Sequence, residues 1–317
     1  MGNFQLVVWA VVPPLLLLIY YYHRVPSAPS LPKLVLLFVV GAISGLVALD
    51  LELRFEFLAH WVINWEQMTQ SLPGIALRQL VEVGPIEEGS KLGSVILLQG
   101  SRPKRTITLF LSTTAVALGF TAEENWVYLA NGTASILDRL IGTPVHAMFS
   151  APWGYALGLA RASRFQSSGY RGLIIRAWLN AVICHALVNV LSSAWRYSPP
   201  PDLLSYGLFP FLVWMFWRLE RLLRRSQGKF PLALISGRKR IQYFWRLGLA
   251  LFATAIGGNA IFGLFLLGRN LSPLSPSQLF SPDMRWFIVS RFGLNLITGL
   301  IAWGVYRYLR HSANRLN

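Results

Sequence analysis

Long runs of apolar residues recur along the whole chain, and short polar stretches between them hold most of the charges. A helix needs about 20 mostly apolar residues to cross the hydrocarbon core of a bilayer. Runs that meet or approach this length lie near 4–22, 34–50, 106–130, 140–160, 172–195, 203–217, 247–268 and 286–306. A further run, near 73–99, is apolar at its ends but contains charged residues. The pattern predicts an all-α polytopic transmembrane bundle of about nine spans.

The composition supports this class. Hydrophobic residues make up 54% of the 317 residues and charged residues only 13%, whereas about 25% of an ordinary soluble domain is charged. So few charges cannot cover the surface of a soluble protein, and they exclude a disordered chain or a coiled coil. The single cysteine, Cys184, excludes an internal disulfide and a zinc site built from cysteines.

The basic residues predict how the chain crosses the membrane. The net charge is +16, and Lys and Arg gather in alternate loops between the apolar runs. Because positive loops stay on the cytoplasmic side, we expect the N-terminus outside and the C-terminus inside. We therefore expect a multi-pass integral protein of a bacterial-type plasma membrane, with anionic lipid headgroups at the basic loops and no nucleic-acid partner.

The order of the runs suggests four regions. The stretch 51–69 mixes charges with Phe and Trp, which is typical of an amphipathic helix at the membrane interface. The regions are 1–72, two spans and this interfacial helix; 73–217, a core of five spans; 218–246, a basic cytoplasmic loop; and 247–317, a two-span extension.

Acidic residues inside the predicted spans are the strongest functional signal. An ionised side chain at the bilayer centre costs roughly 2.5–3.5 kcal/mol, so such residues usually face a protein or water cavity. In Glu87-Glu88-x-x-Lys91, both carboxylates can approach the ammonium on one helical face. One of them can then remain available as a general base. The structural alternative is a buried ion-pair network that joins neighbouring helices.

A second cluster follows on the next long run. Phe120, Glu124 and Tyr128 recur at four-residue spacing, which places them on one helical face. Asn125 and Tyr128 can hydrogen-bond a carboxylate. An aromatic stripe that packs against another helix would explain the aromatic residues of this pattern, but it would not explain the glutamate.

Two histidines lie inside the following runs. His146 alone would more often be a satisfied core residue than a ligand. His185 and Asn189 are four residues apart and share a face, so an imidazole and an amide can point toward one place. Such a pair suits oxyanion stabilisation or one edge of a metal site.

With these motifs the sequence resembles the PrsW family of intramembrane proteases, within the superfamily of the type II CAAX prenyl proteases. The resemblance covers roughly residues 74–195. It rests on Glu87-Glu88-x-x-Lys91, Phe120-x-x-x-Glu124-Asn125, His146 with Gly154, Gly158, Ala160 and Arg161, and His185-x-x-x-Asn189. The family pattern has Asp or Asn at the last position, and the Asn of this chain favours an amide donor over a metal ligand.

The resemblance implies hydrolysis of a peptide bond of a membrane-protein substrate, within or beside the bilayer. It implies that Glu87 or Glu88 activates water, that Glu124 and a histidine hold the water, and that His185 and Asn189 stabilise the oxyanion. The resemblance leaves the cofactor open, because this chemistry can proceed without one or with a divalent zinc ion on Glu124, His146 and His185.

Three other functions compete with this one. Buried Glu and His residues also serve as relays in proton- or cation-coupled transporters, although the chain has no detectable inverted repeat. A processing enzyme similar to the CAAX proteases and a non-catalytic scaffold are the others; the presence of all four motifs argues against the scaffold.

Overall fold

In a computed structural model, residues 3–25, 28–99, 105–163, 169–198, 201–229 and 240–314 are described. Every regular element within these ranges is a helix, so the predicted all-α class is confirmed. The elements are α1 (Asn3–His23), α2 (Leu31–Ala59), α3 (Trp65–Met68), α4 (Leu72–Arg78), the π-helix η1 (Gln79–Val83), α5 (Gly84–Gln99), α6 (Thr106–Ala130), α7 (Ile136–Gly142), α8 (Val145–Ala162), α9 (Gly169–Ser193), the 3-10 helices η2 (Ala194–Arg196) and η3 (Pro201–Gly207), α10 (Leu208–Ser226), α11 (Arg240–Leu271), α12 (Pro276–Leu279) and α13 (Pro282–Asn314).

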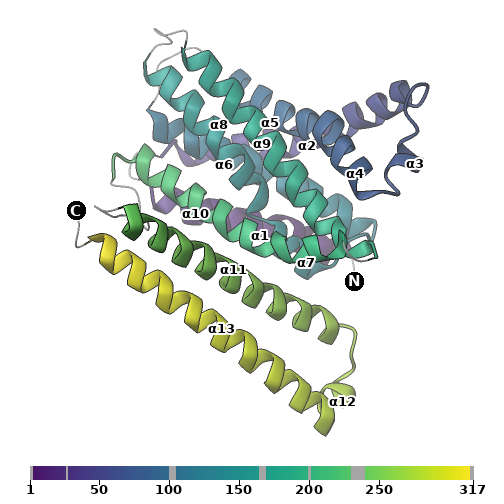
Figure 1. The fold of residues 1–317 in the computed structure, drawn as a ribbon. Helices are drawn as coiled ribbons and strands as arrows, with labels where there is room; N and C mark the ends of the chain where they lie inside the picture. Colours follow the sequence, from purple (N-terminus) through teal and green to yellow (C-terminus); the bar gives the residue numbers. More distant parts are fainter. Residues whose placement is uncertain are drawn as a thin grey trace. The chain divides into compact units, whose positions relative to one another are not determined.

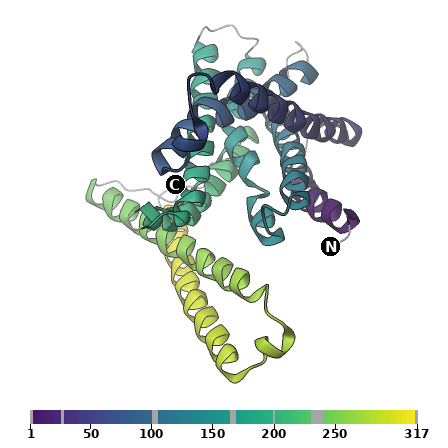
Figure 2. The ribbon, with the colours of Figure 1, turned by 90° about the vertical axis from the view of Figure 1, so that its right-hand side faces the viewer.

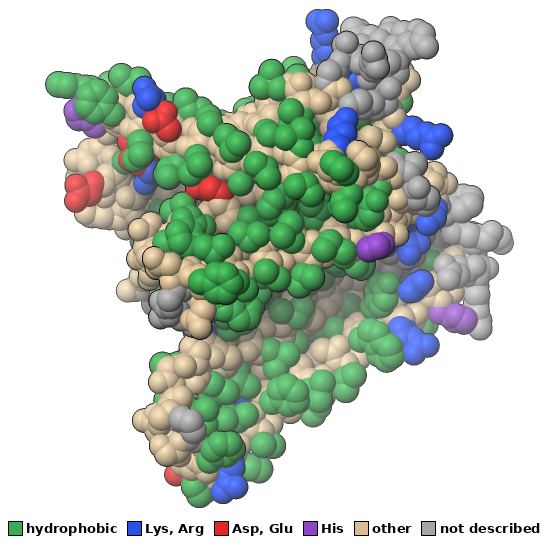
Figure 3. All heavy atoms as spheres, turned by 180° about the vertical axis from the view of Figure 1, so that it is seen from behind, with side chains coloured by type: hydrophobic (Ala, Val, Ile, Leu, Met, Phe, Trp, Pro, Cys, Tyr) green, Lys and Arg blue, Asp and Glu red, His purple; other side chains and the backbone are tan. Residues whose placement is uncertain are grey.

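Six of the described helices are long and apolar enough to cross a membrane: α1, α2, α6, α9, α11 and α13. Figure 3 shows hydrophobic side chains over much of one face of the molecule, as expected for helices that contact lipid. The predicted runs near 73–99, 140–160 and 203–217 are helical too, but they do not reach this length and apolarity. Multiple spans are therefore supported, and the count of nine and the orientation of the termini stay predictions.

The helices form two compact units. The first consists of Met1–Ser193 and Arg218–Phe230, and the second of Ala194–Trp217 and Pro231–Asn317. The boundary between them falls inside α10, where the sequence predicted the start of a basic loop at 218. Residues 218–226 continue α10 as a helix, and the part of that loop from 230 to 239 lies outside the described residues.

The stretch 51–69 differs from the predicted interfacial helix. Residues 51–59 continue α2, and only Trp65–Met68 forms a separate helix, α3. Residues 51–59 contain no proline or glycine to end α2, and Asp50 accepts a 2.7 Å hydrogen bond from Arg54 one turn later. The helix therefore runs past the apolar run that predicted its end.

In the first unit, α6 packs against α1, α2 and α8, and most of its residues are buried (Figure 1). Glycines let these backbones approach closely. A Cβ at Gly119 of α6 would collide with the carbonyl of Phe38 on α2. A Cβ at Gly158 of α8 would come within 2.8 Å of Thr106 Cα on α6. The tight α2–α6 and α6–α8 contacts bring the helices that carry the motifs together.

In the second unit, α11 and α13 run side by side as a long pair connected through α12 (Figure 2). Gly263 of α11 faces Asn295 of α13, and a Cβ at this glycine would collide with the Asn295 amide. None of the motif residues lies in this unit.

Candidate active site

The first motif begins directly after an interruption of the helix. Pro85 has no N–H to donate to the carbonyl four residues before it. In the π-helix η1, the N–H of Gly84 instead bonds to the carbonyl of Gln79, five residues before it. Such π-turns are frequent at functional sites. The wider turn sets where α5 begins, and Glu87 lies in the first turn of α5.

Lys91 lies at the centre of the site and is fully buried. Its ammonium is 2.7 Å from Glu88 Oε1, 3.3 Å from Glu87 Oε2 and 2.9 Å from His146 Nδ1. It also lies 4.0 Å from the centre of the Phe120 ring, which is a cation–π contact. The predicted approach of both carboxylates to this lysine is confirmed.

Glu88 uses both of its oxygens within the protein. Oε1 accepts from Lys91, while Oε2 accepts from Ser150 Oγ and from Trp153 Nε1, each at 3.0 Å. Its side chain is completely buried. Glu88 therefore joins α5 to α8 and has no exposed oxygen with which to meet a substrate.

Glu87 is held on one side only. Its Oε2 contacts Lys91, whereas Oε1 has no hydrogen-bond partner among the described residues and lies 3.9 Å from His185 Nε2. Glu87 also lines a pocket. One of the two adjacent glutamates therefore remains open to a small molecule such as water.

The second motif supports His146 from the other side. His146 Nδ1 faces the Lys91 ammonium, so it acts as the acceptor, and Nε2 then carries the proton and donates to Glu124 Oε2 at 2.8 Å. Glu124 Oε2 also accepts from Arg139 at 2.5 Å. Arg139 in turn donates to Asn125 Oδ1 at 2.6 Å. This chain of contacts fixes the orientation of the imidazole.

The remaining supporting residues take part in the same arrangement. Asn125 also donates to the carbonyl of Ala10 on α1 at 3.3 Å. The ring of Tyr128 lies 4.6 Å from the guanidinium carbon of Arg139. Tyr128 therefore contacts Arg139, which in turn holds Glu124.

The last motif contributes a histidine that lacks a hydrogen bond. The ring of His185 stacks on Phe149 with the centroids 4.7 Å apart. Its buried Nδ1 has no hydrogen-bond partner in the described part of the chain. Asn189 shares the face of α9, as predicted from the spacing, but its amide donates to Gln79 Oε1 at 2.7 Å. That bond uses one of the two N–H groups of the amide.

Glu87, His146 and His185 form a group that could hold a metal ion. One donor atom from each lies within 4.8 Å of the others, and all three residues are buried. Two imidazoles and a carboxylate suit zinc, so the donor set fits. The predicted set had Glu124 in place of Glu87; in the structure Arg139 and His146 hold Glu124. Lys91 contacts two of the three donor residues, Glu87 and His146.

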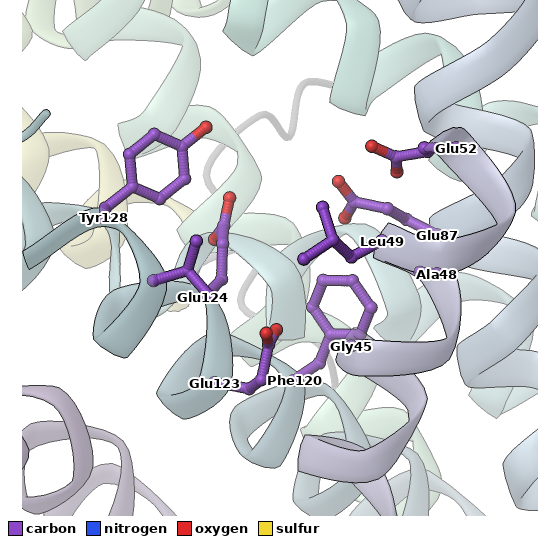
Figure 4. A pocket seen from close by; sticks show the side chains of 10 residues that line it. Gly45, Ala48, Leu49, Glu52, Glu87, Phe120, Glu123, Glu124 and Tyr128 are labelled. Carbon is purple, nitrogen blue, oxygen red and sulfur yellow. The ribbon is translucent and has the colours of Figure 1, made fainter. Parts of the chain in front are cut away.

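The pocket beside Glu87 measures about 140 Å³. Its wall is rich in carboxylates, and the labelled side chains in Figure 4 include all four of them. The lining residues are Gly45, Ala48, Leu49, Glu52, Glu87, Phe120, Glu123, Glu124, Val127 and Tyr128. Gly45 makes room for Glu123, because a Cβ at this glycine would collide with the Glu123 carboxylate. The pocket thus opens onto the carboxylate of the first motif.

Several residues of the site were not predicted. Ser150 and Trp153 follow His146 at four and seven residues, so helical spacing could have placed all three on one face. Arg139 appeared to be an ordinary loop cation, and Glu52 belonged to the stretch predicted to be interfacial. No pattern in the sequence distinguishes these two from other charged residues.

Comparison with known proteins identifies a family whose matched range contains the site described above. Residues 29–216 match the family described as PrsW family intramembrane metalloprotease. Neither the curated proteins nor the solved structures gave a match. The matched range includes all four motifs and every residue of the buried cluster around Lys91. The chain therefore belongs to the PrsW family of intramembrane proteases and is a multi-pass integral membrane protein.

Proposed function

We propose that this chain hydrolyses a peptide bond of a membrane-protein substrate with water activated by Glu87. The observation that carries the proposal is the Oε1 of the buried Glu87 carboxylate, which has no hydrogen-bond partner in the described part of the chain and lies 3.9 Å from His185 beside a pocket. A general base must reach the water that it deprotonates. Glu88 is saturated with hydrogen bonds, which favours Glu87 over its neighbour.

The neighbouring side chains suit the remaining steps. Glu87 takes a proton from water while the water oxygen attacks the peptide carbonyl carbon. His185, with the free N–H of Asn189, donates to the resulting oxyanion. When the C–N bond breaks, Glu87 returns the proton to the leaving amine. Lys91 and Glu124 hold His146 in a fixed orientation beside the reacting groups throughout.

A metal-dependent version of the reaction is the second candidate, because the donors of Glu87, His146 and His185 lie within 4.8 Å of one another. Bound there, a divalent ion would act as a Lewis acid that polarises water. The position of Lys91 favours the first candidate, because its ammonium already contacts two of the three residues and would repel a divalent ion bound between them.

The test of the function compares wild-type protein with Glu87→Gln in reconstituted bilayers that contain an extract of membrane proteins. We expect new peptide termini in or beside membrane spans with the wild type, reduced by about 10²–10⁴ in the variant. Termini that arise equally with Glu87→Gln would contradict the proposal.

The metal content of the same preparations separates the two candidates. The glutamate mechanism predicts that chelation leaves the rate unchanged and that activity does not follow the bound zinc. Stoichiometric zinc that is lost and restored together with activity would instead establish the metal-dependent version. His185→Ala should lower zinc binding only in that second case.

The location and topology complete the proposal. We place the chain in a bacterial-type plasma membrane with the C-terminus in the cytoplasm, on the basis of its alternating basic loops. A reporter that is active only in the cytoplasm should therefore be active when fused to the C-terminus, and a reporter that is active only outside the cytoplasm should not. Family membership favours hydrolysis over the transporter that the buried glutamates also suggested.

A further inference from the structure

A second pocket, of about 240 Å³, lies away from the candidate active site and has a different character. It is lined by Arg24, Arg224, Gln227 and Lys229. All four residues belong to the first compact unit. Three of the four side chains are cationic, and none is acidic. This composition suits an anion.

The backbone at the end of α10 places two of these cations. Gly228 adopts the left-handed conformation, with φ of 68°, which commonly ends a helix. The N–H of Lys229 then bonds to the carbonyl of Arg224 at 2.9 Å. This helix end folds Lys229 back over the last turn, toward Arg224. The pair is therefore positioned by the backbone.

A hydrogen bond connects this helix end to the end of α1. The amide of Gln227 donates to the carbonyl of Arg24 at 2.7 Å. The guanidinium of Arg24 is itself oriented by Glu220 at 2.6 Å and by the hydroxyl of Tyr20 at 2.7 Å. Hydrogen bonds therefore hold the ends of α1 and α10 together beside the pocket.

The charges around the pocket are not balanced. Glu220 partly neutralises Arg24, but the side chain of Lys229 has no ion pair among the described residues. Nε of Arg224 is buried and lacks a hydrogen-bond partner in the same part of the chain. A buried donor without a partner is costly. An anion with several oxygens could accept from both free cations at once.

The position along α1 indicates where such an anion comes from. Helix α1 is one of the six candidate spans and ends at His23. Tyr20, Tyr21 and Tyr22 lie in the last turn of α1, just before His23 and Arg24, and tyrosines are enriched at the membrane–water interface. Arg24 therefore lies at the level of lipid headgroups, where phosphate groups are the abundant anions.

We propose that this pocket binds the phosphate group of an anionic membrane lipid, held between the ends of α1 and α10. The site is distinct from diffuse attraction of basic loops to a charged membrane, because it requires particular cations. It is also independent of the proposed hydrolysis.

The test measures binding of phosphatidylglycerol, phosphatidylcholine and inorganic phosphate to the full-length protein in detergent, by native mass spectrometry and titration. The variants are Arg224→Gln, Lys229→Gln and the double variant. Arg225→Gln is the matched control, since it removes the same charge from the same turn but Arg225 does not line the pocket. Lys229 is exposed, so its substitution should leave the fold intact.

We expect one tightly bound phosphatidylglycerol in the wild type and weaker binding of phosphatidylcholine. A surface cation contributes about 1 kcal/mol, or roughly fivefold, so the double variant should lose at least about 25-fold. The control should lose less than fivefold. Equal losses in Arg225→Gln and Lys229→Gln would overturn the pocket in favour of diffuse attraction. Binding of inorganic phosphate without any lipid preference would overturn the assignment to a lipid.

Discussion

The two adjacent glutamates should respond differently to the same substitution. Glu88→Gln keeps the shape of the side chain but removes the charge that faces Lys91 at 2.7 Å. Breaking a buried ion pair costs about 3–5 kcal/mol. The hydrogen bonds from Ser150 and Trp153 add less, because bonds between helices in membranes average about 0.6 kcal/mol. We therefore expect Glu88→Gln to lower the free energy of unfolding by about 3–5 kcal/mol.

Glu87→Gln is the matched comparison. Its contact with Lys91 is longer, at 3.3 Å, and its other oxygen has no hydrogen bond among the described residues. This variant should lose less stability than Glu88→Gln, because Lys91 keeps its shorter contact with Glu88, while its rate should fall by about 10²–10⁴. Unfolding in mixed micelles with increasing dodecyl sulfate measures the first quantity, and cleavage in bilayers measures the second.

The result that would refute this reasoning is an exchange of the two phenotypes. A stable, inactive Glu88→Gln beside a destabilised Glu87→Gln would mean that the hydrogen bonds of Glu88 do not determine its role. Full activity of Glu87→Gln in a stable protein would remove it as the base. A Lys91→Met variant should destabilise the fold as well, since it leaves both carboxylates without their buried cation.

Two further predictions concern packing and the oxyanion. Gly158→Val should destabilise the fold by about 1–3 kcal/mol through overpacking, because a Cβ would lie 2.8 Å from Thr106 Cα. Gly172→Val, where a Cβ meets no atom within 4 Å, is its control, and equal unfolding midpoints would contradict the packing. Asn189→Ala should lower turnover by about 10²–10³ and Gln79→Ala by much less, as measured by initial rates; equal losses would assign Asn189 a structural role.

The sequence predicted the helices and the helical faces that the motif residues share, because both follow from periodicity. Apolar runs predict helices wherever they occur. A buried charge in such a run usually faces a protein or water cavity, so the charged motif residues were expected to face the interior of the bundle rather than lipid. This argument requires only that charges avoid lipid. It does not require the packing angles between the helices to be known.

The finer assignments depended on contacts that spacing does not determine. Glu87 joins the possible metal group because its carboxylate lies near both histidines, while Glu124 is held by Arg139, which comes from a short helix after a loop. The continuation of α2 past its apolar run was missed, because an apolar window ends where charges begin even when the helix does not. Glu52 was consequently not among the predicted site residues.

The difference between Glu87 and Glu88 illustrates what tertiary structure adds. Neighbouring residues on an α-helix point about 100° apart, so the pair cannot face the same surroundings. One carboxylate meets Ser150 and Trp153 on α8, and the other meets the pocket. Lys91 contacts both carboxylates. Under the proposed mechanism, this paired motif combines a structural anchor, Glu88, with a reactive group, Glu87, and the packing of α8 determines which glutamate takes which role.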